Sequence, residues 1–118
     1  MFISFCKSKI GHARVTEAEL FYEGSITIDE VLLKAVDVIP GEKVEVLNVN
    51  NGMRFETYTI PGPANSGQIC LNGPAARLGV VGDQLIILSY ALVDATEAKS
   101  LKTKIIHLDD KNKISKKI

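Results

Sequence analysis

The chain has 118 residues with 14 basic and 14 acidic side chains, so its formal net charge at pH 7 is zero. This length suits one compact domain over residues 1–118, and a composition of 46% hydrophobic and 24% charged residues is typical of a globular protein in water. The balanced charge argues against a nucleic-acid partner, and no apolar run reaches the roughly 20 residues of a membrane helix.

The N-terminal part of the chain predicts strands and one short helix. Residues 1–10 form an apolar strand and lack the pattern of a signal peptide. Residues 12–20 alternate weakly and predict a second strand, and the β-branched residues 25–28 predict a third. Asp29 then caps a short helix, whose apolar face would comprise Val31, Leu32, Ala35 and Val36.

A β-hairpin is the clearest element in the middle of the chain. Residues 43–50 and 53–60 both alternate, and Asn51-Gly52 between them favours a tight turn because both residues tolerate positive φ. The alternation places Arg54, Glu56 and Tyr58 on one face of the second strand, with Phe55, Thr57 and Thr59 on the other.

The C-terminal half predicts further short strands. Residues 68–72 form one strand, residues 73–79 fit one helical turn, and residues 82–93 are apolar on both faces, which is typical of a central strand. Residues 102–108 form a last strand, and the lysine-rich end favours a solvated tail or a protected edge strand. Many short strands in a small chain indicate a closed or nearly closed barrel.

Several familiar sites are excluded by the sequence. The segment "GPAARLG" lacks the Lys-Ser/Thr that ends a phosphate-binding loop, and no second glycine makes Ser25 a nucleophile elbow. Two histidines, His12 and His107, are too few for a catalytic zinc site, so no metal is expected. The widely spaced Cys6 and Cys70 match no metal spacing and indicate free thiols in a cytoplasmic protein.

The pair Gly24-Ser25 stands between two strand-like runs and has two interpretations. A bend or bulge in a barrel strand is the commoner reason for such a pair. The alternative is self-cleavage, in which the serine hydroxyl attacks the carbonyl of the unhindered glycine and elimination leaves a dehydroalanine. Hydrolysis of that group gives a pyruvoyl ketone at a new N-terminus, which can form a Schiff base with an amine.

Seven motifs around this pair carry a resemblance to a known family. They are, in order, "KSKI", "VTEAEL", "YEGSITID", "NVNNG", "RFETYTI", "CLNGPAARL" and "VGDQLIILSYA". Together they span Lys7 to Ala91, and the chain resembles the pyruvoyl-dependent aspartate 1-decarboxylases. The resemblance implies a mainly β fold, a small six-stranded double-psi β-barrel with short helices. It also implies a cytoplasmic homotetramer with active sites between adjacent subunits.

The resemblance further implies an activity. Autocatalytic cleavage at Gly24-Ser25 would give a β chain of residues 1–24 and an α chain of residues 25–118, with a covalent pyruvoyl cofactor derived from Ser25. The enzyme would convert L-aspartate to β-alanine and CO2 for pantothenate biosynthesis. A helper protein for maturation is compatible with this expectation.

Site residues follow from the resemblance position by position. Lys9 and Arg54 correspond to the cations that bind the substrate carboxylates, and Tyr58 corresponds to the proton donor. Thr57 corresponds to the hydroxyl that supports the Gly24 carbonyl during cleavage, although alternation places it on the face opposite Tyr58. The remaining expected substrate contacts are Asn72, Gly73, Pro74, Ala75 and Tyr22.

Two departures from the family pattern are expected to matter. The histidine that usually stands two residues after the lysine is replaced by Gly11, with His12 one place later, which we expect to loosen the strand holding Lys9. Pro74 stands where alanine is frequent and has no N–H to donate. Two other functions stay open at this stage: a non-enzymatic β-barrel module that binds or assembles, and a pyruvoyl decarboxylase of another amino acid such as glutamate.

Overall fold

The computed structural model describes residues 1–118 and is built mainly from strands. The strands are β1 (Phe2–Arg14), β2 (Glu17–Glu19), β3 (Ser25–Asp29), β4 (Lys43–Asn48), β5 (Arg54–Gly62), β6 (Ile69–Asn72), β7 (Gln84–Asp94), β8 (Lys104–Leu108) and β9 (Ile114–Lys117). Three short helices complete the chain: α1 (Glu30–Ala35), the 3-10 helix η1 (Gly73–Arg77) and α2 (Ala95–Ala98). None of these helices has the length and hydrophobicity required to span a bilayer.

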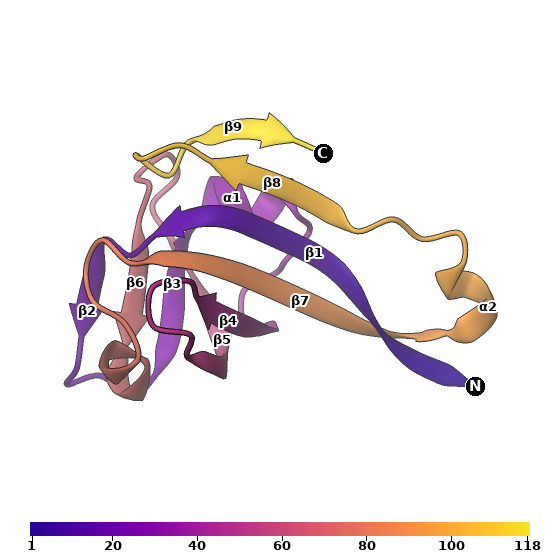
Figure 1. Cartoon of the computed structure of the whole chain (residues 1–118), viewed down its shortest axis with the longest axis horizontal. Helices are drawn as coiled ribbons and strands as arrows, with labels where there is room; N and C mark the ends of the chain where they lie inside the picture. Colours follow the sequence, from indigo (N-terminus) through magenta and orange to yellow (C-terminus); the bar gives the residue numbers. More distant parts are fainter.

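The nine strands follow the order β2-β6-β3-β5-β4-β7-β1-β8-β9, so the mainly β class is confirmed (Figure 1). Strand β3 lies between β6, its antiparallel partner, and β5, its parallel partner. Strand β7 lies between β4 and β1, as its apolar sequence predicts. Its second half leaves the core with β1, and these two strands extend to α2 and the N-terminus at one end of the molecule (Figure 1).

Strand β1 differs from the expected pair of strands, because it runs without interruption from Phe2 to Arg14. Pairing with β7 shifts register between Ile10 and Ala13, which marks a β-bulge, and His12 occupies the left-handed region with φ 62°. The replacement at Gly11 therefore does not end or free the strand. A Cβ at Gly11 would lie 2.8 Å from Cδ2 of His107, so the glycine makes room for that ring.

The predicted helix and hairpin are confirmed. Oδ1 of Asp29 accepts a hydrogen bond from the backbone N–H of Val31 at 2.9 Å and so caps α1. The same buried carboxylate accepts hydrogen bonds from the backbone N–H groups of Asn65 and Gly67, which fix the loop before β6. Helix α1 buries both Leu32 and Leu33. The apolar face expected from the sequence includes Leu32 but not Leu33.

One hydrophobic core lies between the strands and α1. Eighteen buried residues form it, with contributions from every strand except β2, β5 and β9, and it includes Ile26, Ile28, Val46, Leu71 and Leu85. The lysine-rich end does not leave the fold as a tail, because β9 pairs antiparallel with β8 at the edge of the sheet. Cys6 and Cys70 are free thiols, and Cys70 is buried.

Candidate active site

The backbone has positive φ on both sides of the bond between Gly24 and Ser25, which is strained for the serine. Gly24 has φ 126° and Ser25 has φ 124°, in a region that residues with a Cβ rarely adopt. Ser25 is the first residue of β3 and only 1% exposed, so the sheet holds it in this conformation. Such a conformation costs on the order of 1–3 kcal/mol, and it persists only where surrounding structure imposes it.

Asn72 fixes the hydroxyl of Ser25 from the neighbouring strand. The two residues are register partners in β3 and β6, and Nδ2 of Asn72 donates to Oγ of Ser25 at 2.9 Å and to Oγ1 of Thr27 at 2.9 Å. Oδ1 of Asn72 accepts a hydrogen bond from the Cys70 thiol at 3.2 Å. Burial, followed by the charges of Glu17 and Glu19, raises the pKa of Cys70, so the thiol stays protonated and serves as donor.

Gly73 lies against the chain that leads to the strained bond. Its φ is 67°, and a Cβ at this position would lie 2.5 Å from the carbonyl oxygen of Tyr22 and 2.8 Å from the nitrogen of Gly24. Only glycine allows this approach. Pro74 follows within η1 at a position where a proline is tolerated, because the first N–H groups of a helix have no partner within it.

A pocket of about 370 Å³ opens beside Ser25. Seven residues expected from the sequence line it: Gly24, Ser25, Thr57, Tyr58, Asn72, Pro74 and Ala75. Thr57 and Tyr58 both reach the pocket although they alternate along β5, because β3 pairs with β5 only from Thr59 onward. Thr57 and Tyr58 therefore border the space beyond the start of β3, where the pocket forms.

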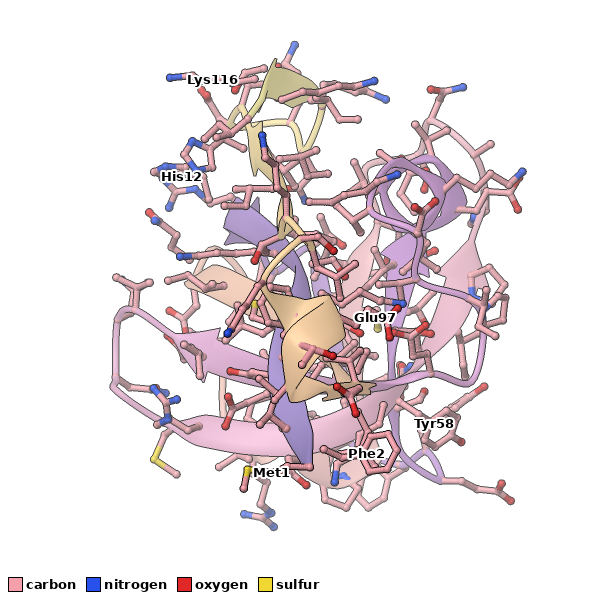
Figure 2. The ribbon with its side chains drawn as sticks, turned by 90° about the vertical axis from the view of Figure 1, so that its right-hand side faces the viewer. Met1, Phe2, His12, Tyr58, Glu97 and Lys116 are labelled. Carbon is pink, nitrogen blue, oxygen red and sulfur yellow. The ribbon has the colours of Figure 1, made fainter.

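Four expected site residues do not line this pocket: Lys9, Arg54, Tyr22 and Gly73. Lys9 is half-buried on β1, where it pairs with Leu88 and Ile105 of the flanking strands. Arg54 lies on the exposed face of β5, and its Nη2 is 3.5 Å from Oε1 of Glu45. Tyr22 is 53% exposed and meets Gly73 through its backbone. Figure 2 shows His12, near Lys9 on β1, and Tyr58 on opposite sides of the molecule.

The comparisons with known proteins point to one family. The family model described as aspartate decarboxylase matches residues 1–115. The chain belongs to the aspartate decarboxylase family. The aspartate 1-decarboxylase of Pelotomaculum thermopropionicum is 57% identical over 97% of this chain and 86% of the relative. The aspartate 1-decarboxylases of Carboxydothermus hydrogenoformans, 57% identical over 98% of this chain and 91% of the relative, and Thermoanaerobacter pseudethanolicus, 58% identical over 91% and 92%, are similar in the same way.

Membership of the aspartate decarboxylase family confirms the resemblance drawn from the seven motifs. It also confirms the enzyme class, a carboxy-lyase, and leaves a non-enzymatic barrel module without support. The arrangement at Ser25 fits the pyruvoyl group of such an enzyme. A buried serine hydroxyl, a strained bond with glycine on its acyl side and an open pocket meet at one place.

Four residues of the pocket were not among the expected site residues. They are Glu23, Phe55, Glu56 and Leu78. Sequence proximity was the available signal for the two acids, since Glu23 precedes Gly24 and Glu56 precedes Thr57. Phe55 and Leu78 carry no chemical signal, and only their packing places them at the pocket.

Proposed function

We propose that this chain decarboxylates L-aspartate to β-alanine and CO2, for pantothenate biosynthesis in the cytoplasm, after cleaving itself between Gly24 and Ser25. The observation that carries the proposal is the strained, buried bond at the wall of a pocket lined by Thr57 and Tyr58. Family membership supplies the class of reaction. The free thiols Cys6 and Cys70 support a reducing cytoplasm.

Cleavage begins with Oγ of Ser25 attacking the carbonyl carbon of Gly24. The amide is exchanged for an ester, and the strain at Ser25 is relieved as the C–N bond breaks. Loss of the Ser25 α-proton then expels the Gly24 carboxylate and leaves a dehydroalanine. One water converts its imine form to the ketone and releases ammonia. Asn72, which donates to Oγ of Ser25, leaves the hydroxyl proton free to be removed.

The mature pyruvoyl group at position 25 supplies a ketone that reacts with the substrate amine and accepts the electrons released with CO2. The side chains of the pocket position the substrate and move the proton. Tyr58 returns a proton to the substrate carbon from the wall opposite Asn72, and Thr57 orients the carbonyl of Gly24 during cleavage. Asn72 and the segment Gly73–Ala75 hold the substrate from the η1 side.

A neighbouring copy of the chain completes the site. The pocket of one chain has two acidic lining residues and no lysine or arginine, whereas aspartate brings two carboxylates. Lys9 and Arg54 are the cations that the family pattern assigns to those carboxylates, and in one chain neither lines the pocket. A homotetramer with sites between adjacent subunits brings them together, and Arg54 can then form a bidentate carboxylate contact.

The strands that surround the site would form the six-stranded double-psi barrel of the family. The parallel pair β3–β5 inside an otherwise mostly antiparallel sheet supports crossing connections of this kind. A crystal structure of the processed protein with an open sheet in place of a closed barrel would exclude this arrangement.

Intact mass spectrometry tests the cleavage. The purified chain should yield two fragments split at Gly24-Ser25, and Ser25→Ala should yield one uncleaved, inactive chain. Fragments from Ser25→Ala, split at the same bond, would contradict the assignment. Cleavage in a cell lysate but not in the purified protein would assign maturation to a helper.

Subunit complementation tests the shared site. Ser25→Ala and Arg54→Ala are each expected to be inactive, and their co-expression should restore part of the activity if the two residues of one site come from different copies. No recovery from mixed oligomers would place both residues in the same chain. A comparison of kcat/KM for L-aspartate and L-glutamate tests which amino acid is the substrate. L-glutamate is the appropriate competitor, because one added methylene changes selectivity by only about 10- to 200-fold in most pockets.

A further inference from the structure

Both charged residues that line the Ser25 pocket are acidic. Glu23 takes part in no ion pair, and Glu56 is the second acid. The inference below rests on the proposed function, in which this pocket receives a dicarboxylate. The carboxylates of a substrate that enters beside two acidic side chains are repelled by both unless a cation neutralises those side chains.

Glu56 lies in an unusual charge arrangement on the outer face of β4 and β5. Glu45 is its direct cross-strand partner, so two like charges stand opposite each other, which is normally destabilising. Each of the two acids instead forms an ion pair with a basic residue at a diagonal position on the neighbouring strand. Nζ of Lys43 lies 2.7 Å from Oε2 of Glu56, and Nη2 of Arg54 lies 3.5 Å from Oε1 of Glu45.

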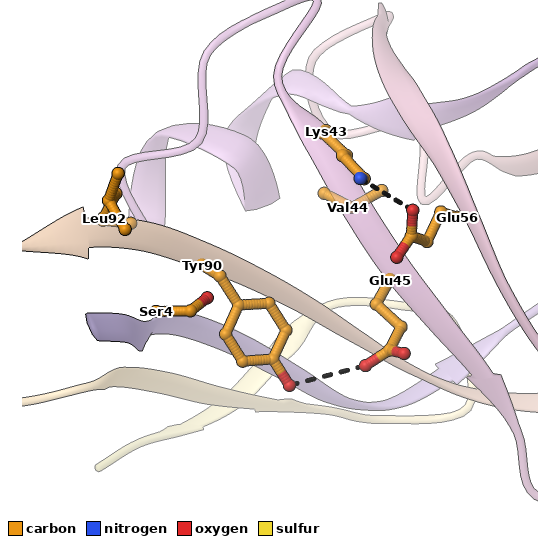
Figure 3. A pocket seen from close by; sticks show the side chains of 8 residues that line it. Ser4, Lys43, Val44, Glu45, Glu56, Tyr90 and Leu92 are labelled. Atoms are coloured by element: carbon orange, nitrogen blue, oxygen red, sulfur yellow. Dashed lines mark hydrogen bonds and ion pairs between the residues drawn. The ribbon is translucent and has the colours of Figure 1, made fainter. Parts of the chain in front are cut away.

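Lys43 contacts Glu56 from outside the Ser25 pocket. Glu56 lines the Ser25 pocket, a depression of about 320 Å³ beside Tyr58, and a third depression of about 460 Å³ beside Tyr90. Lys43 lines only the last two. Figure 3 shows the third depression, with the Lys43–Glu56 ion pair across it and the Tyr90 hydroxyl donating to Glu45 at 3.4 Å.

We propose that Lys43 is a specificity-determining residue for the dicarboxylate substrate and acts through Glu56. The ion pair draws the Glu56 carboxylate toward Lys43 and neutralises it, so the rim of the pocket admits an anion. Lys43 is a positioning residue, since it does not line the pocket where the reaction occurs. Both side chains are well exposed, 72% and 60%, so their pairing contributes little to folding.

A double-mutant cycle tests the proposal. Lys43→Met keeps the length of the side chain and removes its charge, and it should raise KM for L-aspartate about three- to fivefold at low salt, as expected for partly screened charges. The kcat should stay within about twofold, because uniform binding affects KM alone. Glu56→Gln should lower KM or leave it unchanged. The double variant should return to the KM of Glu56→Gln, because Lys43 then has no charge to neutralise.

Lys34→Met provides the matched control. Lys34 pairs with Glu30 on the surface of α1, with similar exposure, and neither residue lines the Ser25 pocket. This variant should leave KM unchanged. An unchanged KM in Lys43→Met would show an ordinary surface ion pair and overturn the proposal. A raised KM that persists in the double variant would show direct contact of Lys43 with substrate and would overturn it too.

Binding of succinate separates this inference from the proposed function. Succinate has the two carboxylates of aspartate but no amine, so calorimetry reports the charge of the pocket without the reaction. The Kd of succinate should change as KM does among the unmodified protein, Lys43→Met, Glu56→Gln and the double variant. These differences in Kd should disappear at 1 M salt, where charges are screened within about 3 Å. The same differences in a protein that does not decarboxylate L-aspartate would refute the proposed function and uphold the role of Lys43. Turnover of L-aspartate without these differences in Kd would support the proposed function and refute the role of Lys43.

Discussion

Ser25 combines three properties that rarely occur together in one residue. It is 1% exposed, its φ of 124° is unfavourable for a residue with a Cβ, and its hydroxyl accepts a hydrogen bond from the amide of Asn72. A residue kept only as a bend in a strand would be glycine, which has no penalty there. The cost of placing serine at this position is consistent with a hydroxyl that the chemistry requires.

Tyr58 gives the sharpest prediction at the scale of single residues. Tyr58→Phe should cleave normally at Gly24-Ser25, because its hydroxyl is assigned to the step after CO2 leaves. Its kcat should fall about 10²- to 10⁴-fold, the range for loss of a general acid. Intact mass and steady-state kinetics measure the two effects separately.

Tyr90→Phe is the control for that experiment. Tyr90 is as exposed as Tyr58, at 45%, and lines a different depression. It should retain the kcat of the unmodified enzyme. If Tyr58→Phe kept its turnover within a few-fold, the proton donor would have to be another group.

At the scale of elements, the site depends on where three segments meet. Strand β3 begins at Ser25, β6 ends at Asn72 opposite it, and η1 begins at Gly73 directly against the chain before Ser25. The pocket occupies the space that β3 leaves beside β5. Under the proposed function, cleavage and substrate binding would both depend on the close contact between η1 and residues 22–24.

Gly73→Ala should block or strongly slow self-cleavage. The new Cβ would lie 2.5 Å from the carbonyl oxygen of Tyr22 and would displace the strained segment, and φ 67° adds a cost of about 1–2 kcal/mol. The fraction of cleaved chain, followed by mass spectrometry over time, measures the effect.

Gly52→Ala separates the clash from the backbone cost. Gly52 has a similar φ of 76° in the β4–β5 turn, but nothing lies within 4 Å of a Cβ placed there. This variant should lose similar stability and cleave at the normal rate. Equal slowing in both variants would mean that general destabilisation, and not the contact with residues 22–24, controls cleavage.

At the scale of the whole molecule, the N-terminal and C-terminal strands lie side by side and bring two histidines together. Gly11 of β1 and His107 of β8 are parallel register partners, and the rings of His12 and His107 meet edge to face with centroids 4.7 Å apart. Burial, followed by the positive charges of His12, Lys116 and Lys9, lowers the pKa of His107 below its ordinary value of 6.5.

Stability should therefore fall as the pH drops below about 6.5. The unfolded chain takes up a proton on His107 at a higher pH than the folded chain, so protonation favours unfolding between 6.5 and the lowered pKa. The lowered carboxyl pKa values of Glu42 and Asp83 act in the same direction only in more acidic solution, below their unfolded values of 4.5 and 3.8. The Tm should be lower at pH 5.5 than at pH 7.5.

His107→Gln assigns the effect to one ring. This variant should show a smaller difference in Tm between pH 5.5 and 7.5, and His12→Gln should show an intermediate one, since it removes one positive neighbour of His107. The same pH dependence in His107→Gln and the unmodified protein would assign it to other groups.

Local sequence patterns predict most of the short elements and the family of the chain. Asp29 before an apolar run predicts the start of α1, Asn51-Gly52 between alternating strands predicts the hairpin, and the motifs around Gly24-Ser25 identify the family. These signals are local, because capping, turn geometry and strand alternation depend on residues close together in the chain.

The combination of residues that are far apart in the chain follows from the folded structure. Strand β1 continues through a bulge between Ile10 and Ala13, and Gly11 makes room for the ring of His107. Thr57 reaches the pocket with Tyr58 because β3 pairs with β5 only from Thr59 onward. Register between strands likewise keeps Lys9 and Arg54 out of the Ser25 pocket. The same register places the charge of Glu56 in the lining of that pocket. Pairing register is a non-local property, since a shift of one residue turns every side chain to the opposite face.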